Sequence, residues 1–136
     1  MASATNFRWG QGEDLTIELI YKEGEDPKTA VAVPLGAGYD LRMDIVNPSN
    51  GLLITSLTSE DDEVILSSGE DDTPNITVYL PRALTLSGGE IYTVMLPPTN
   101  LSSFSYDIFL RNTQSDRQIK ILKGTITVED SHTLWP

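Results

Sequence analysis

The sequence contains no cysteine and only one histidine, His132. Without cysteine the chain cannot form a disulfide, a thiolate nucleophile or a zinc–thiolate site. A single histidine, with no second imidazole and no thiol, does not make a nucleophile–base pair or a usual transition-metal site. We therefore expect no enzyme activity, no catalytic residues and no bound cofactor.

Long apolar runs are also missing, since no segment approaches the roughly 20 consecutive apolar residues of a membrane-spanning helix. Residues 1–6, Met-Ala-Ser-Ala-Thr-Asn, lack the basic and apolar regions of a signal peptide. These features predict a protein that is made in the cytoplasm and does not enter a membrane.

Basic residues are scarce: nine Lys and Arg stand against 20 Asp and Glu, which gives a net charge of −11. Such a surface repels nucleic acid and anionic lipid, so neither is an expected partner. Acidic residues crowd at 60–63 and 70–72, whereas four of the nine basic residues lie between Arg111 and Lys123. This placement is typical of solvated loops, and it also fits contacts between an acidic edge and a less acidic one.

Adjacent carboxylates at Asp61-Asp62 and Asp71-Asp72 are the remaining candidates for catalysis. A carboxylate pair can hydrolyse glycosides, but runs of this kind in polar loops are typically solvated. Oxygen ligands from Asp71, Thr73 and Asn75, or from residues 60–63, would suit Ca²⁺. Because the D-x-[DN]-x-[DN]-G loop is absent, we predict no metal ligand, and a calcium ion in these loops stays an open alternative.

Apolar and polar residues alternate with a period of two in several short segments that are separated by turn-forming residues. This pattern predicts strands over residues 15–21, 31–33, 39–45, 52–57, 64–66, 76–80, 92–96, 106–110 and 118–128. No segment carries a helical apolar stripe of about ten residues or more. We expect an all-β fold, an immunoglobulin-like β-sandwich of about seven to nine short antiparallel strands.

Some local features complete this expectation. Residues 82–86 fit either a helical turn or an irregular link, and residues 99–103 leave room for one helical turn capped by Asn100. Gly124 marks a candidate β-bulge, because the alternation of the last strand changes phase there. The predicted organisation is a flexible arm over 1–5, the sandwich over 6–129 and a tail over 130–136.

The two tryptophans lie near opposite ends of the chain, at Trp9 and Trp135. An exposed tryptophan can anchor an interface, whereas a buried one fills the core. Core or edge packing suits Trp9, which lies next to a predicted strand, while the apolar ending Leu134-Trp135 suits a segment that docks. We name Phe7, Trp9, Leu134 and Trp135 as candidate partner-contact residues.

Several segments are similar to a known family. Residues 7–17 resemble a Phe-x-x-x-Gln-Gly-Asp-Thr-hydrophobic start, followed by a Tyr-Lys-Glu-Gly turn at 21–24 and an x-Arg-Met-x-Ile strand at 41–45. The later half has Phe-Ser-Tyr-Asp-Ile at 104–108 and Leu-Lys-Gly-Thr-Ile-Thr-Val at 122–128. In this order they resemble the small immunoglobulin-like domains of tailed-bacteriophage virion proteins, including the N-terminal domain of baseplate upper proteins.

The resemblance implies a virion structural protein without catalytic residues, made in the host cytoplasm and oligomeric in the particle. Its expected partners are other virion proteins of a tail, baseplate or capsid, on which it would dock as a connector, adaptor or decoration subunit. Residues 51–86 depart from the family pattern as an insertion of extra strands. The alternative is a carbohydrate-binding module, whose structural sign would be three exposed coplanar aromatic residues on one sheet face.

Overall fold

A computed structural model describes residues 3–24, 26, 28, 30–60, 64–67 and 73–131 of the chain. The strands in these residues are β1 (Ser3–Ala4), β2 (Phe7–Gly10), β3 (Leu15–Leu19), β4 (Lys22–Glu23), β5 (Val31–Ala32), β6 (Tyr39–Val46), β7 (Leu53–Thr58), β8 (Val64–Leu66), β9 (Ile76–Leu80), β10 (Ser103–Asn112) and β11 (Gln118–Glu129). Two short helical elements, the 3-10 helix η1 (Arg82–Thr85) and the α-helix α1 (Glu90–Met95), connect β9 to β10. The prediction of an all-β fold is confirmed.

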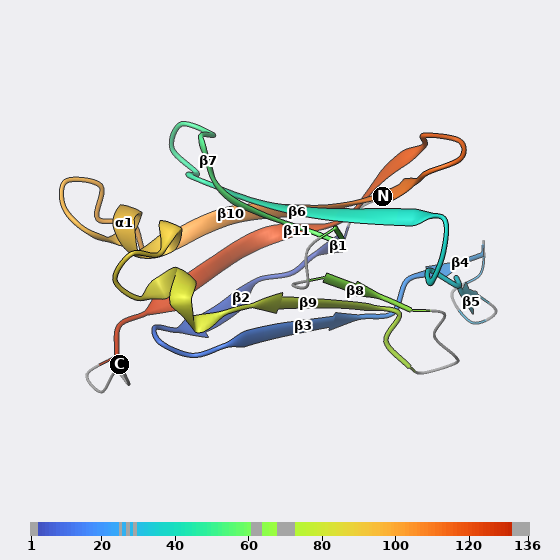
Figure 1. Ribbon diagram of the computed structural model, residues 1–136, viewed down its shortest axis with the longest axis horizontal. Helices are drawn as coiled ribbons and strands as arrows, with labels where there is room; N and C mark the ends of the chain where they lie inside the picture. Colours follow the sequence, from blue (N-terminus) through green and yellow to red (C-terminus); the bar gives the residue numbers. More distant parts are fainter. Residues whose placement is uncertain are drawn as a thin grey trace.

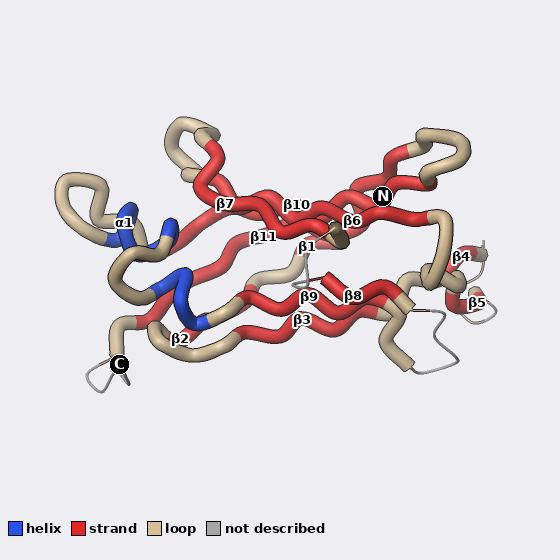
Figure 2. The backbone as a smooth tube through the Cα atoms, in the orientation of Figure 1, coloured by secondary structure: helices blue, strands red, loops and turns tan. Residues whose placement is uncertain are grey.

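The strands form two sheets that lie face to face (Figures 1 and 2). The larger sheet has the order β1-β11-β10-β6-β7, and β2 also pairs with β11. The smaller sheet has the order β3-β9-β8, and β4 pairs with β5 in a separate hairpin. The neighbours β6, β7, β10 and β11 pair antiparallel, whereas β1 and β2 run parallel to β11.

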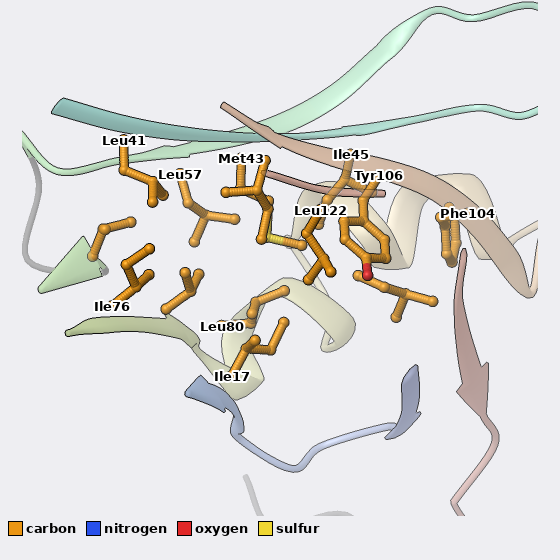
Figure 3. Close-up of a cluster of buried hydrophobic side chains, with 14 of the residues drawn as sticks. Ile17, Leu41, Met43, Ile45, Leu57, Ile76, Leu80, Phe104, Tyr106 and Leu122 are labelled. Carbon is orange, nitrogen blue, oxygen red and sulfur yellow. The ribbon is translucent and has the colours of Figure 1, made fainter. Parts of the chain in front are cut away.

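The core fills the space between the two sheets, because alternate residues of each strand point inward. Figure 3 shows side chains of the larger sheet, such as Met43 and Leu122, directed toward Ile17 and Leu80 of the smaller one. Burial of each such side chain stabilises the fold by roughly 1.5–3 kcal/mol. The outward-facing residues of the same strands are mostly charged or hydroxyl-bearing, which explains why the period of two was readable in the sequence.

The strand predicted over residues 92–96 is wrong, because α1 covers Glu90–Met95 instead. Apolar residues that alternate over so short a segment also fit one helical face, on which residues four apart lie together. Ile91 is buried and Met95 is half-buried on that face. Residues 82–86 contain η1, whereas residues 99–103 are not helical, because Asn100 has a φ of 50° and Ser103 begins β10.

β11 contains a bulge, at Ile121 rather than at the glycine that the phase change suggested. The pairing with β10 shifts from Ile108–Leu122 to Phe109–Lys120, which leaves Ile121 as the extra residue. The shift lets Leu122 face the core while Lys120 faces outward, although an unbroken strand would place these two residues on one face.

Gly124 instead allows a close approach of the N-terminal segment. A Cβ atom at this position would overlap the carbonyl oxygen of Thr5, in the gap between β1 and β2. The amide of Thr5 donates to the carbonyl of Lys123 at 2.9 Å. Residues 3–5 therefore lie on the sheet, and the flexible arm over residues 1–5 stays a prediction. None of the helices in the described part of the chain is long and apolar enough to cross a membrane.

Candidate contact surfaces

Two of the four predicted contact residues lie in β2. Trp9 is 1% exposed, and its indole N–H donates to the carbonyl of Glu13 at 2.7 Å. The structure therefore places Trp9 in the core rather than at a contact surface. Phe7 is half-buried and its ring lies 5.7 Å from that of Tyr106, centroid to centroid. Leu134 and Trp135, like His132, lie outside the described residues.

Side chains as well as backbone hold the N-terminal segment, residues 3–10, on the larger sheet. The Asn6 side-chain oxygen accepts hydrogen bonds from the Thr125 amide at 3.1 Å and from its hydroxyl at 3.0 Å. The Tyr106 hydroxyl donates to the Thr5 carbonyl at 2.6 Å. Burial raises the pKa of Tyr106 to about 12, so this donor stays protonated at neutral pH. The chain's own N-terminal strands β1 and β2 thus form the edge of the sheet beside β11.

The turn after β2 is anchored at the helical end of the molecule. The Gly12 amide donates to the Thr85 hydroxyl at 2.9 Å, and the Gln11 side chain donates to the Thr85 carbonyl at 3.2 Å. Ser131 donates its hydroxyl to the Gln11 carbonyl at 2.7 Å. This turn has a structural role, because its amides are engaged by the protein itself.

The outer face of the larger sheet carries several ion pairs. Arg42 donates to Asp44 at 2.7 Å, and Ser56 donates its hydroxyl to the same carboxylate oxygen at 2.6 Å. Arg111 pairs with Asp40 at 2.6 Å. The hydrogen bond and the charge of each carboxylate raise the pKa of the guanidinium that it holds.

A surface hollow of about 460 Å³ lies among these ion pairs, beside β6, β10 and the end of β7. Phe109 lines it, and the Lys120 ammonium lies 5.3 Å from the centre of the Phe109 ring. The lining combines charged and hydroxyl-bearing side chains with the apolar groups of Leu41 and Phe109.

Of the calcium candidates, Asp71 and residues 61–63 lie outside the described residues. Asn75 is fully buried, and its side chain bonds the backbone of Tyr21 in both directions and the carbonyl of Val33. Its oxygen therefore has a structural role at the end of β9. Among the described residues, no three acidic or histidine side chains are grouped as a metal site would require.

Outward-facing aromatic residues in the described strands are Phe109 on the larger sheet and Tyr79 on the smaller sheet. Because the two sheets face each other across the core, these rings lie on opposite sides of the molecule. The described faces therefore lack the row of three coplanar aromatics that would indicate a sugar platform. No protein-family model matches the sequence, and no curated protein is significantly similar to it.

Proposed function

We propose that the chain is a non-enzymatic, immunoglobulin-like structural protein of a tailed-bacteriophage virion. In this role it docks on a tail, baseplate or capsid assembly as a connector, adaptor or decoration subunit. The proposal rests on one structural observation, the order of the strands, together with the resemblance of residues 7–128 to such domains.

The strand order supports the immunoglobulin-like assignment in both sheets. An immunoglobulin domain pairs strands B, E and D in one sheet and C′, C, F and G in the other. The chain order β3, β6, β7, β8, β9, β10, β11 corresponds to B, C, C′, D, E, F, G, and the observed pairings β3-β9-β8 and β7-β6-β10-β11 follow the same scheme. The N-terminal strands β1 and β2 join the sheet of G, where both run parallel to β11.

The surface chemistry favours docking over catalysis. A sandwich fold hosts many functions, so the function has to come from surfaces and sites. Here the surface consists of sheet edges and paired charges. The net charge of −11 keeps unassembled subunits apart and soluble. Those properties suit a subunit that accumulates before it joins an assembly.

Sedimentation of purified particles tests the proposal. Tagged full-length chain is mixed with particles from the lysate of its source, and the bound fraction is measured in a density gradient. We expect comigration with particles, and loss of comigration when residues 130–136 are deleted if the predicted tail contact operates. A chain that stays at the top of the gradient, with no copy detected in particles by mass spectrometry, overturns the virion role.

A glycan array probed with the same chain distinguishes the carbohydrate-binding alternative from the structural role. Binding that depends on Phe109, the aromatic residue in the hollow, would support that alternative. Binding to particles without binding to glycans would favour the structural role.

A further inference from the structure

Two ion pairs belong to the lining of the surface hollow on the larger sheet. Arg111 and Asp40 lie opposite each other on β10 and β6, with 2.6 Å between the guanidinium and the carboxylate. Arg42 and Asp44 occupy alternate positions of β6 and are 2.7 Å apart. The hollow of about 460 Å³ is as large as many small-molecule sites, which measure roughly 300–1,000 Å³.

Each of these ion pairs keeps hydrogen-bonding groups that the described part of the chain does not use. Arg42 donates from Nε to Asp44 and from Nη2 to Ser56, so its Nη1 group stays available. The Asp44 Oδ1 atom accepts from both Arg42 and Ser56, which leaves Oδ2 available. In the other pair, Arg111 donates from Nη2 to Oδ2 of Asp40. All four charged side chains are partly exposed, so a ligand in the hollow can reach these groups.

Neighbouring donors and acceptors of this kind match hydroxyl groups. A hydroxyl both donates and accepts hydrogen bonds, so it can bond a guanidinium and a carboxylate that lie side by side. The aspartates of the two pairs, Asp40 and Asp44, are four residues apart on β6, and Arg42 lies between them, roughly 7 Å along the strand from each. A six-membered sugar ring carries hydroxyls around its rim over a span of this size.

Phe109 adds an apolar surface beside these polar groups. It lies opposite Arg42 on the neighbouring strand and lines the hollow. The Lys120 ammonium is 5.3 Å from the centre of the ring but lies outside the lining of the hollow. An aromatic ring packs against the C–H groups of a sugar, while polar side chains around it fix the orientation of the ligand.

We propose that the hollow binds one neutral saccharide unit, with its hydroxyls on the two ion pairs and its ring against Phe109. The charges of the lining favour a neutral ligand. The carboxylates of Asp40, Asp44 and Glu60 outnumber the two guanidiniums, so an anionic ligand meets excess negative charge in a chain whose net charge is −11. A cationic ligand meets both arginines. A neutral ligand bonds the ion pairs without separating their charges.

The contact is limited, so binding of a free monosaccharide is weak. With one aromatic ring and two exposed ion pairs, we expect a dissociation constant on the order of 1 mM. Many copies held on one particle would bind a surface rich in glycans more tightly, because each bound copy raises the effective concentration for the next. The inference goes beyond the proposed virion role and does not rest on it.

Nuclear magnetic resonance of the full chain tests the site. The probes are the methyl glycosides of glucose, galactose, mannose and N-acetylglucosamine, each titrated to about 20 mM. We expect saturable shifts of the amides in residues 40–44 and 109–111 with at least one probe. Glucuronate and glucosamine test the role of charge and should bind at least about fivefold more weakly. The proposal is overturned if no neutral probe saturates, if the shifts lie elsewhere, or if a charged sugar binds best.

Substitutions at the hollow separate a built site from surface stickiness. Phe109→Ala should weaken binding at least about fivefold, whereas Tyr79→Ala, which removes the outward-facing ring on the opposite side, should leave it unchanged. Arg111→Lys keeps the charge but loses the forked donor geometry, and should weaken binding about threefold or more. Because the ligand is neutral, affinity should change by less than about twofold between low and high salt. Unchanged affinity in both hollow variants overturns the proposal.

The outcomes for this site and for the virion role are distinct. Sugar binding by a chain that also comigrates with particles describes a virion subunit with a sugar site. Sugar binding without comigration overturns the virion role and leaves the sugar site standing. Comigration without sugar binding overturns the sugar site and leaves the virion role standing.

Discussion

The two edges of the larger sheet are built in opposite ways. At one edge the N-terminal strand lies parallel to β11, with Trp9 in the core and Tyr106 bonded to the Thr5 carbonyl at 2.6 Å. At the other edge β7 pairs with one strand, β6, and also contacts α1. Its sequence is uncharged, and Leu53 is 53% exposed. The first edge, called the closed edge below, consists of two short strands that side chains anchor to the sheet, whereas the second, called the open edge, is the longer strand β7.

The difference shows that short edge strands are held by side-chain contacts as well as by backbone pairing. Parallel pairing is slightly less stable per residue than antiparallel pairing, and β1 and β2 are only two and four residues long. Buried aromatic groups and the hydrogen bonds that Thr125 donates to the Asn6 side-chain oxygen also hold these strands in place. β7 has the more stable antiparallel ladder to β6, and its outward side still offers backbone groups to a second strand.

Truncation of Trp9 should have the largest effect on the closed edge. Trp9→Ala leaves a cavity in the core and removes the indole bond to Glu13, and we expect a loss of about 3–5 kcal/mol in the free energy of unfolding. Leu53→Ala at the open edge, where the side chain is half exposed, should change it by at most about 0.5 kcal/mol. Urea unfolding followed by tryptophan-independent circular dichroism measures both. Similar losses for the two variants would contradict the contrast between the edges.

A side chain at Gly124 should release the N-terminal strand without destroying the sandwich. Gly124→Ala places a Cβ against the Thr5 carbonyl, so we expect a loss of about 1–3 kcal/mol. Hydrogen exchange should rise in residues 3–10 and stay unchanged in β6. Ser105→Ala, which lies on the neighbouring strand β10, is the control and should leave exchange in residues 3–10 as it was.

Alkaline pH should loosen the same edge through Tyr106. Its pKa rises from an ordinary value of 10 to about 12 because of burial, so the folded chain holds this proton where the unfolded chain has lost it. The contribution of Tyr106 to stability is complete below pH 10 and declines as the pH rises from 10 to 12.

Tyr106→Phe isolates this effect from those of the other tyrosines. The variant should lose about 1 kcal/mol at neutral pH, because the Thr5 carbonyl no longer receives a hydrogen bond. Its stability should then fall less steeply than that of the unmodified chain at alkaline pH. Unfolding titrations across this range compare the two slopes, and parallel slopes would show that Tyr106 does not titrate with folding.

Much of the fold could be predicted from the local alternation of apolar and polar residues. The strands at 39–46, 64–66 and 76–80 match their predicted positions because one face is buried and the other is solvated. α1 was missed because a short apolar alternation does not distinguish a strand from one helical face. The burial of Trp9, by contrast, agrees with the packing that its place beside a strand suggested.

Contacts between segments that are distant in the sequence could not be predicted from it. Asn6 meets Thr125 across 119 positions of sequence, and Gly124 is needed only because Thr5 passes over it. In the sequence alone such a glycine looks like a bulge signal. The open edge of β7 was unpredictable for a similar reason, since an uncharged strand is expected in a sheet interior and only strand order reveals that it lies at the border.

Charge should contribute least to the closed edge. Arg8 and Glu129 form its ion pair at 3.4 Å, with side chains 84% and 56% exposed. Exposed pairs of this kind are screened and contribute little, so Arg8→Ala should reduce stability by at most about 0.5 kcal/mol, and less at high salt. Thermal unfolding at low and high salt measures the difference. A loss as large as that of Tyr106→Phe would mean that electrostatics, and not aromatic packing and Asn6, closes this edge.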